Sequence, residues 1–542
     1  MSREGIPGIP RSAVLLGPGG VPVPPAVSYP VRAAAVDVGS NAIRYVVAEV
    51  SETGKYTEVE SERLAVRLGG DVFTKARALS PTTLQMAVDA LSRIRRRLDD
   101  LGIAHYRAVA TSAVRESSNG GELVDRVRRE CGLHLETISG SEEARLVWLA
   151  VGDRIHLGSD RWFLMDLGGG SLEVSVVDRD GILWSESHTL GTVRLLNAFQ
   201  EEERRVDGED YRDLLERYVH GLRVQAAIAD WEPVATVATG GNIEALADLA
   251  GAPLDEATGV PRLSLKELRR VLGQLVGLDM EERISELGLR QDRADVIVPA
   301  AVVYERVADL AGAAEILVPG VGVKEGLVLD LVEGLRDSTG RSGRREREVH
   351  AAALALGRRC RFDEAHARQV AELSLSIFDQ MGELHGFGER ERLVLLAAAL
   401  LHDIGQFISY RRHHKHSMYL IGNSELSGLS PGEVQLVAVI ARYHRRAEPR
   451  LDHEEFARLS DGGREVVRRL AAILRVADAL DREHVARVSS LDLVITGTEA
   501  VLEVETTGPL ALEEWALRKK GRLFGEVFGR FPALRSSVTS RP

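Results

Sequence analysis

The stretch AAAVDVGSNAIRYVVAEV, residues 33–50, decides the fold of this chain. Its apolar first half predicts a buried strand, DVGSN predicts a tight turn, and the β-branched residues that follow predict a second strand. The stretch RWFLMDLGGGSLEVSVVD, residues 161–178, has the same order, and Asp166 occupies the position that Asp37 has in the first stretch. The repeat predicts an internal duplication, with two α/β units that each open on strand, turn and strand.

Changes of composition along the chain predict six segments. Proline and glycine are dense near the N-terminus, a polar Gly/Ser-bearing stretch precedes a long helical pattern, and an alternating pattern begins near residue 490. We therefore predict a flexible leader at 1–30, α/β domain I at 31–155, α/β domain II at 156–335, a linker at 336–349, an all-α domain at 350–487 and a small β-containing C-terminal cap at 488–542.

Charge and composition exclude several classes of protein. The 542 residues carry a formal charge of −12, which argues against a nucleic-acid-coating protein, and no specific nucleic acid is expected. Two cysteines cannot form a disulfide framework, so we expect a reducing, cytoplasmic compartment. The longest apolar run, Leu393 to Leu401, falls well short of the roughly 20 residues that cross a bilayer, and no membrane partner is expected.

The two Asp-Gly turns have the chemistry of a phosphate and metal site. Glycine turns present consecutive N–H groups to phosphate, and an aspartate ahead of the turn can coordinate Mg²⁺. One such turn is equally typical of an ordinary hairpin, but a second copy and a third glycine pair after another predicted strand favour the functional interpretation. The candidate phosphate-binding residues are Gly39, Ser40, Asn41, Gly168, Gly169, Gly170, Ser171, Gly240 and Gly241.

Paired turns of this kind are typical of the actin-like (ribonuclease H-like) fold of sugar kinases, heat-shock chaperones and certain phosphatases. The segments ATSAVR (110–115), SGSEEARL (139–146), GTVRL (191–195) and GVKEG (322–326) narrow the choice. Together with DVGSNAIR and DLGGGSLE they resemble the Ppx/GppA family of exopolyphosphatases and guanosine pentaphosphate phosphohydrolases, over residues 34–330. The resemblance implies a duplicated phosphatase core, Mg²⁺ as cofactor, inorganic polyphosphate or guanosine penta/tetraphosphate as partner, and a homodimer.

The resemblance also implies roles for single residues. Glu143, the second Glu of SGSEEARL, matches the family's catalytic carboxylate, which would orient or deprotonate the attacking water. Its alternative is a helix-capping charge. Asp37, Asp166 and Glu173 match the catalytic acidic positions that hold Mg²⁺. Arg44 and Arg115 are candidate phosphate clamps, as is Lys324, which stands where the family more often has Arg.

Histidines and aspartates recur in the predicted helical domain. Their order resembles the HD phosphohydrolase superfamily, with His366, His402, Asp403 and Asp478 as ligands of one Mn²⁺, Fe²⁺ or Zn²⁺ ion. His416 and His444 are candidates for a second metal. In long Ppx-like proteins this domain is often degenerate and helps to line a polyphosphate channel, so a second catalytic site and a structural role both stay open.

The sequence favours an exopolyphosphatase, a hydrolase of terminal phosphoanhydrides, with Glu143 activating water in the cleft between the two α/β domains. Hydrolysis of pppGpp to ppGpp at the same residues is the nearest alternative. An ATP-binding kinase or chaperone, a non-catalytic sensor of alarmone or polyphosphate, and a metal-dependent phosphohydrolase in the HD-type domain are the other classes considered.

Overall fold

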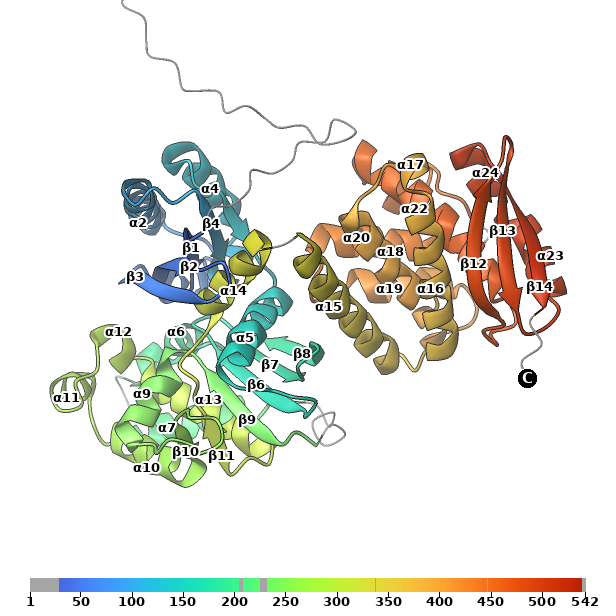
Figure 1. Ribbon diagram of the computed structural model, residues 1–542. Helices are drawn as coiled ribbons and strands as arrows, with labels where there is room; N and C mark the ends of the chain where they lie inside the picture. The colour runs from blue at the N-terminus through green and yellow to red at the C-terminus, as the bar shows by residue number, and fades with distance from the viewer. Residues whose placement is uncertain (1–28, 204–207, 225–231, 337, 446, 539–542) are drawn as a thin grey trace, which may run out of the picture.

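The computed structural model describes residues 29–203, 208–224, 232–336, 338–445 and 447–538. Apart from its last two residues, the predicted leader at 1–30 lies outside the described residues. Two α/β halves lie beside a helical domain, which carries a small sheet at its far end (Figure 1).

The first half is built on a five-stranded sheet of order β3-β2-β1-β4-β5. β1, β2 and β3 are antiparallel, whereas β4 and β5 run parallel to β1. Alternate residues of β1 point to opposite faces: Ala34 packs toward α2, and Ala35 packs toward α5 and α14. The strands are β1 Val31–Val38, β2 Ile43–Val50, β3 Tyr56–Leu64, β4 His105–Ala110 and β5 Leu135–Thr137, and the helices are α1 Gly69–Val72, α2 Pro81–Asp100, α3 Ser112–Glu116, α4 Gly120–Arg126 and α5 Gly140–Arg154.

The second half repeats this topology. Its six-stranded sheet has the order β10-β11-β9-β6-β7-β8, in which β8-β7-β6-β9-β11 corresponds to β3-β2-β1-β4-β5. This correspondence confirms the duplicated α/β layout. The strands are β6 Trp162–Leu167, β7 Leu172–Val177, β8 Ile182–His188, β9 Ala235–Thr239, β10 Arg262–Ser264 and β11 Glu315–Leu317, and the helices include α6 Thr192–Glu203, α7 Gly208–Val219, α9 Gly241–Ala250, α10 Leu265–Val276, α11 Met280–Ser285, α12 Gln291–Ala294, α13 Ile297–Leu310 and α14 Val323–Arg336.

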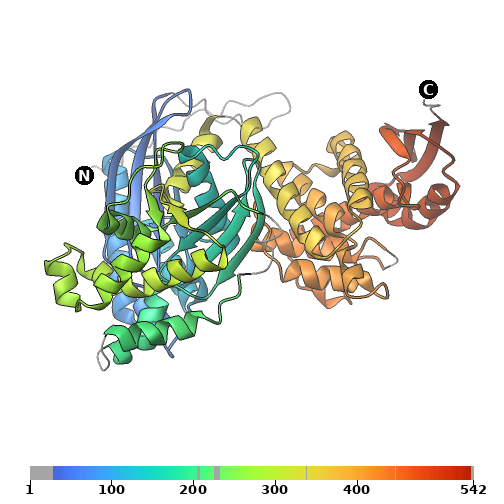
Figure 2. The ribbon, with the colours of Figure 1, turned by 90° about the horizontal axis from the view of Figure 1, so that it is seen from below.

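Helices α5 and α14 join the two halves. One apolar core contains residues of both sheets, such as Val46 and Leu164, together with Leu146 of α5 and Leu327 of α14. In the view from below, the second half lies largely in front of the first, and the helical domain lies to one side of both (Figure 2). The shared core fixes α5 between the strand ends from which the two Asp-Gly turns emerge.

The segment predicted as a linker at 336–349 is largely helical. Helix α15, Ser338–Arg359, runs through it and into the helical domain. The Gly and Ser residues that suggested a linker are followed by Arg and Glu, which favour helix, and by Val349 and Ala353, which are buried in the helical core. The other helices are α16 Glu364–Gln380, α17 Gly382–His385, α18 Glu389–Leu401, the 3-10 helix Ile404–Phe407, α19 His413–Gly422, α20 Pro431–Arg442, α21 Glu454–Ala457 and α22 Asp461–Leu480.

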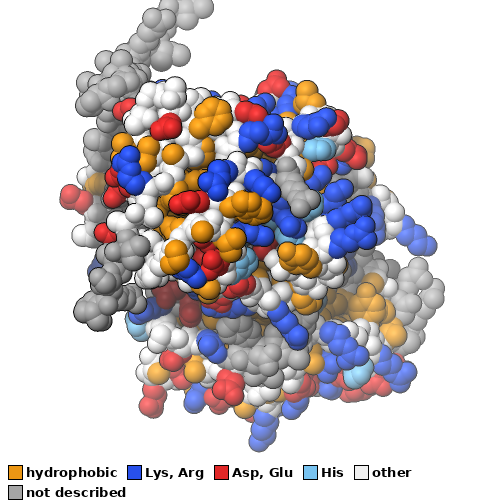
Figure 3. All heavy atoms as spheres, turned by 90° about the vertical axis from the view of Figure 1, so that its right-hand side faces the viewer, with side chains coloured by type: hydrophobic (Ala, Val, Ile, Leu, Met, Phe, Trp, Pro, Cys, Tyr) orange, Lys and Arg blue, Asp and Glu red, His pale blue; other side chains and the backbone are white. Residues whose placement is uncertain are grey.

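A small sheet closes the C-terminal end. β12, Val488–Ile495, and β13, Glu499–Thr506, form the antiparallel hairpin that the alternating pattern indicates, and β14, Phe531–Val538, adds parallel to β13. Helices α23, Ala511–Lys520, and α24, Arg522–Phe528, lie between β13 and β14 in the chain. On the face seen from this end, basic and acidic side chains are intermixed (Figure 3). Within the described ranges, no helix is long and apolar enough to cross a membrane.

Candidate active site between the two sheets

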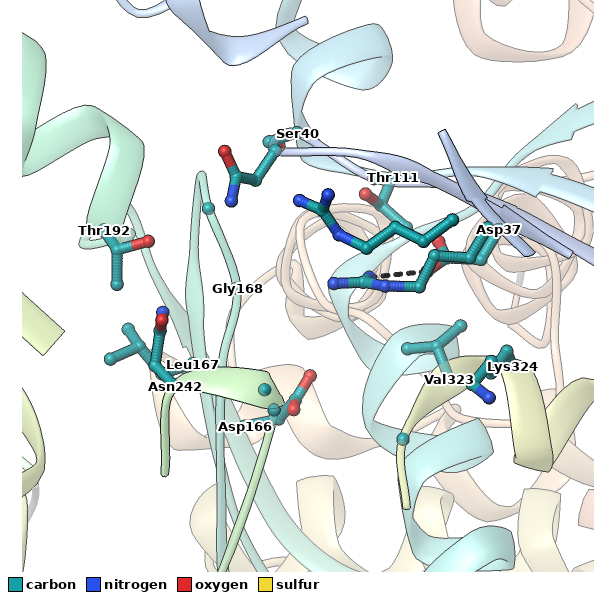
Figure 4. Close-up of a pocket in the computed structure, with 18 of the residues that line it drawn as sticks. Asp37, Ser40, Thr111, Asp166, Leu167, Gly168, Thr192, Asn242, Val323 and Lys324 are labelled. Atoms are coloured by element: carbon teal, nitrogen blue, oxygen red, sulfur yellow. Dashed lines mark hydrogen bonds and ion pairs between the residues drawn. The ribbon is translucent and has the colours of Figure 1, made fainter. Parts of the chain in front are cut away.

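The turns after β1, β6 and β9 line one cavity of about 490 Å³, which lies between the two halves (Figure 4). The start of α5 and the segment before α14 complete its wall. The predicted residues that line it are Asp37, Gly39, Ser40, Asn41, Arg44, Glu143, Asp166, Gly168, Gly169, Gly170, Ser171, Gly240, Gly241 and Lys324. Residues from positions far apart in the sequence therefore meet at one site.

Glycine is needed where these turns approach one another. Gly240 has a φ of 103°, a conformation that side chains other than glycine's rarely adopt. A Cβ atom on Gly191, at the end of the loop before α6, would lie 2.3 Å from the backbone of Gly170. The glycines thus let the backbones close around the cavity and leave their N–H groups near it.

The two halves have an aspartate at the same position of their first strand but residues of opposite charge opposite it on the second strand, Arg44 and Glu173. Asp37 on β1 pairs across the strands with Arg44 on β2, and their side chains form an ion pair with 3.3 Å between Oδ2 and Nη1. In the second half, Asp166 on β6 lies opposite Glu173 on β7. The Thr239 hydroxyl donates to Oδ1 of Asp166. The first half therefore presents an ion pair to the cavity, whereas the second half presents Asp166, with the Glu173 carboxylate buried behind it.

Glu143 reaches the cavity from the first turn of α5. Ser139 caps this helix by accepting a hydrogen bond from the N–H of Glu142. The Glu143 side chain is buried, and its Oε1 accepts a hydrogen bond of 2.5 Å from Nη1 of Arg115. Burial raises the pKa of Glu143 to about 7, against the lowering effect of Arg115. A carboxyl group with such a pKa can take up and release a proton near neutral pH.

Arg115, which the sequence predicts as a phosphate clamp, instead contacts the start of α5. Its Nη1 also donates to the carbonyl of Ile138, at 2.7 Å, and the described lining of the cavity does not include it. Arg115 ends the short helix α3, which follows β4, and from there its side chain extends to the start of α5 rather than to the turns. Its contact is with the carboxylate of Glu143.

The neighbouring acidic residues separate into two groups. Glu142 is ion-paired with Arg107 at 3.0 Å and Arg145 at 2.7 Å, and it is absent from the described lining. Glu173 is buried behind the lining; its Oε1 accepts from the hydroxyl of Ser187, and its Oε2 has no partner among the residues described. Burial, followed by the charges of Glu143 and Asp166, raises the pKa of Glu173 well above its ordinary value.

Asp37 and Asp166 bring to the cavity the oxygen donors of a divalent-cation site, although the described residues include no cluster of three such groups there. Burial raises the pKa of both Asp37 and Asp166, and each carboxylate raises the pKa of Glu143. Buried carboxylates that disfavour one another's charge are stabilised by a cation between them, and carboxylate oxygens are the ligands that Mg²⁺ prefers. The buried Oε2 of Glu173, which has no hydrogen-bond partner among the described residues, is a further oxygen donor near these carboxylates.

Three arginines that no motif indicated also line the cavity. Arg63 on β3 forms an ion pair with Asp292, whereas Arg290 and Arg293 come from the segment around α12. Burial and the nearby Arg290 lower the pKa of Arg293. Such a cation, held partly out of water, suits an anionic ligand. The sequence signal was weak, because Arg63 and Arg293 are far apart in the chain and only the tertiary structure places both on one cavity.

Comparison with known proteins identifies the family of this chain. The model of the Ppx/GppA phosphatase family matches residues 46–334, more than half of the chain. The chain belongs to the Ppx/GppA phosphatase family. Domain III of that family matches residues 347–519, which cover the helical domain and part of the C-terminal cap. As a family member the chain is a phosphoanhydride hydrolase with an actin-like core.

Relatives match over most of this Ppx/GppA chain. The guanosine-5'-triphosphate,3'-diphosphate pyrophosphatase of Vibrio cholerae is 26% identical, over 90% of this chain and 96% of the relative. The protein of the same name from Vibrio vulnificus is 26% identical, over 81% of this chain and 86% of the relative. Among solved structures, an exopolyphosphatase from Cytophaga hutchinsonii is 28% identical, with a TM-score of 0.51, and covers 56% of this chain and 98% of its own.

Domain III gathers most of the predicted HD-type residues. Ligand atoms of His366, His402 and Asp478 lie within 4.8 Å of one another, and Asp403 forms further clusters with His366 and His484 and with His413 and His444. The Nδ1 atoms of His366 and His402 are engaged by Asp481 and by the carbonyl of Ala399. Their buried Nε2 atoms have no hydrogen-bond partner among the described residues, and each lies near a carboxylate, His366 3.8 Å from Asp478 and His402 3.9 Å from Asp403. Lys520 of the cap forms an ion pair with Asp478.

The structure does not bring His416, predicted as a ligand of a second metal, to the cluster around Asp403. His413 takes that place, with its Nε2 3.0 Å from Oδ1 of Asp403, and His444 lies at 3.2 Å from the same atom. His413 is the first residue of α19, directly beside Asp403, whereas His416 lies almost one helical turn further along. Among the described residues, no potential metal cluster includes His416.

Proposed function

We propose that this protein is an exopolyphosphatase that removes the terminal phosphate of inorganic polyphosphate by Mg²⁺-dependent hydrolysis in the cavity between the two sheets. The observation that carries the proposal is Glu143, a buried carboxyl group with a pKa raised to about 7, on the cavity formed by the glycine turns. General bases work best when their pKa lies near the operating pH.

The residues of the cavity have distinct tasks in this reaction. The N–H groups of the turns, with Arg44 and Lys324, bind phosphate oxygens. Glu143 orients a water molecule and takes its proton as the water oxygen attacks the terminal phosphorus; the P–O bond to the bridging oxygen breaks, and phosphate and a shortened chain leave. Arg115 orients Glu143. Asp37, Asp166 and Glu173 would hold Mg²⁺, which when bound supplies positive charge to the phosphate oxygens.

The lining of the cavity favours a polyanion over a nucleotide. Arginines from β2, β3 and the α12 segment extend the positive groups beyond the glycine turns. Among the described residues that line the cavity, Tyr45 is the aromatic one, and it is buried. A guanine base gains much of its binding energy from stacking on an exposed ring, whereas phosphate groups need only the cations and N–H groups.

Hydrolysis of pppGpp at the same site is the second candidate. Asn242 and Glu244 line the cavity beside Gly241, and a carboxylate there suits the N–H groups of guanine better than it suits phosphate. The names of the Vibrio relatives support this candidate as well.

A phosphate-release assay tests the two candidates. With Mg²⁺ present, we expect a higher kcat/KM for long-chain polyphosphate than for pppGpp, and little release from ATP. A higher kcat/KM for pppGpp would replace the first candidate by the second. Turnover of ATP alone would favour an actin-like ATPase, and binding of polyphosphate without turnover would favour a sensor; both would contradict the hydrolytic proposal.

We also propose that domain III binds Mn²⁺, Fe²⁺ or Zn²⁺ through His366, His402, Asp403 and Asp478, with His413 and His444 extending the site toward a second ion. The supporting observation is the pair of buried imidazole Nε2 atoms that have no hydrogen-bond partner among the described residues and lie near carboxylates. Unpaired buried ring nitrogens that converge with carboxylates are the usual donors of such metals. Asp481 and the Ala399 carbonyl, which accept from the opposite ring nitrogens, fix the tautomers.

Metal analysis tests this second site. His402→Ala is expected to lower the metal content of the purified, metal-incubated protein by about one equivalent. His416→Ala is the matched control, because it removes a histidine of the same domain that lies outside the clusters, and it is expected to keep the metal. No bound metal in the wild-type protein would contradict the proposal. Phosphohydrolase activity that survives Glu143→Gln and is lost in His402→Ala would assign catalysis to this centre.

A further inference from the structure

Domain III contacts the helix that carries Glu143 at its first turn. The backbone N–H of Ser141 donates a hydrogen bond of 2.7 Å to Oε2 of Glu425, a residue 284 positions later in the chain. Glu425 lies in the loop between α19 and α20. The N-cap residue Ser139 satisfies the N–H of Glu142, not that of Ser141. The carboxylate of another domain therefore satisfies one of the free N–H groups at the start of α5.

The loop that carries Glu425 is held in place by α15. Arg345 donates from Nε to the carbonyl of Gly428, at 2.9 Å, and its guanidinium pairs with Glu433 at the start of α20. The Glu425 carboxylate is thus attached to a firmly supported loop. Its negative charge next to the N-terminal end of α5 is also favourable for the helix dipole.

A second contact of domain III lies two residues beyond Glu143. The buried Arg145 forms ion pairs with Glu142 at 2.7 Å, with Asp330 of α14 at 2.8 Å and with Glu348 of α15 at 3.4 Å. Glu425 and Glu348 therefore place carboxylates of domain III on both sides of Glu143 along α5. Buried Arg–carboxylate pairs of this kind have defined geometry, which limits movement of α5 along and around its axis.

The opposite side of the first turn is closely packed. A Cβ atom on Gly140 would lie 2.9 Å from the side chain of Ser187 on β8 and 3.5 Å from Oε1 of Glu173. The turn is therefore held between β8 and Glu425. Release of the Glu425 contact would let the turn shift and change the distance from the Glu143 carboxylate to the glycine turns.

We propose that Glu425 is a positioning residue through which domain III fixes the first turn of α5, and with it Glu143, for phosphate release. This inference rests on the proposed function of the cleft. It assigns to domain III a direct effect on turnover that is separate from any metal in its own cluster.

Kinetics of Glu425 variants test the effect on turnover. Glu425→Ala is expected to lower kcat about tenfold with KM changed less than about twofold, because small displacements of a catalytic group reduce turnover. Glu425→Gln keeps an oxygen that accepts from Ser141 and is expected to stay within about threefold of wild type. Glu383→Ala, which removes an exposed carboxylate from α17, is the control and should leave kcat unchanged. A raised KM with unchanged kcat in Glu425→Ala would overturn the proposal.

Hydrogen exchange separates this inference from the proposed function. In the full-length Glu425→Ala protein, the backbone amides of residues 140–143 are expected to exchange about tenfold faster than in wild type and in Glu383→Ala. Unchanged exchange would overturn the positioning role. If the wild-type protein released no phosphate from any substrate, the proposed function would fail, while the exchange rates would still decide whether Glu425 holds the turn.

Discussion

Glu143→Gln is expected to lower kcat for phosphate release about 10³-fold, while the Kd for the non-hydrolysed substrate changes only a few-fold. General-base catalysis contributes about 10²–10⁴ to such rates, and an amide cannot take the proton of the water. The glutamine oxygen can still accept the hydrogen bond from Arg115, so the local geometry is kept. Single-turnover phosphate release and equilibrium binding of polyphosphate measure the two quantities.

Glu142→Gln is the matched control, because Glu142 is the adjacent carboxylate and pairs with Arg107 and Arg145 away from the cavity. Glu142→Gln is expected to lower the free energy of unfolding, because it weakens these ion pairs, and to leave kcat close to that of the wild type. The reverse result, with turnover lost in Glu142→Gln and kept in Glu143→Gln, would contradict the assignment.

The pH profile of the wild type gives a further check on Glu143. Burial raises the pKa of Glu143 to about 7. As the pH falls through this pKa, the carboxylate takes up a proton and can no longer act as a base. A bound cation lowers this pKa, so kcat with Mg²⁺ present should fall on the acidic side, with a midpoint at or below about 7. This acidic limb should disappear from the residual rate of Glu143→Gln.

Gly326→Ala is expected to lower the free energy of unfolding by about 1–3 kcal/mol, the usual effect of inserting a methyl group into a closely packed site. Gly326 lies in the first turn of α14, and a Cβ atom there would be 2.0 Å from the backbone oxygen of Leu146 on α5. One helix must move away from the other. Because α5 carries Glu143, we also expect kcat to fall. Urea unfolding and steady-state kinetics measure both effects.

Gly273→Ala is the matched control for this substitution. Gly273 lies inside helix α10, and a Cβ atom there would have no atom within 4 Å. Alanine favours helix over glycine by about 0.5–1 kcal/mol, so this variant is expected to be slightly more stable than wild type. A Gly326→Ala protein as stable as Gly273→Ala would show that α5 and α14 are not in close contact.

The repeated Asp-Gly turns, together with a third glycine pair after another strand, predicted the duplicated core. Their local patterns determine a strand, a turn and a strand, and the fold brings Asp37 and Asp166, at strand ends of the two sheets, to one cavity. Glu143 could be assigned only by resemblance, because two adjacent glutamates in a helix start are equally suited to capping. The structure separates them, since Glu142 pairs with arginines outside the cavity and Glu143 lines it.

The positions of other site residues could not be predicted, because they depend on tertiary contacts that local sequence patterns do not reveal. Arg115 follows a strand end, as a phosphate clamp would, but the start of α5 lies closer to it than the turns do. Arg293 reaches the cavity because the α12 segment packs near Gly241, which is far from it in the sequence. In domain III, His413 and His416 lie on the same helix, and the position of Asp403 decides between them. The helical continuation through 338–349 required the buried contacts of α15.

The exchange of Arg44 for Glu173 at equivalent strand positions has a consequence for substrate orientation. A duplicated pocket with identical halves would possess a pseudo-dyad, and a linear polyanion could enter it in either of two equivalent directions. Arg44 lines the pocket in the first half, whereas Glu173 is buried behind the lining in the second half, so the two halves of the pocket are not equivalent. The pocket is therefore asymmetric, and we expect Arg44 to orient the end group of a linear polyanion from the first half only.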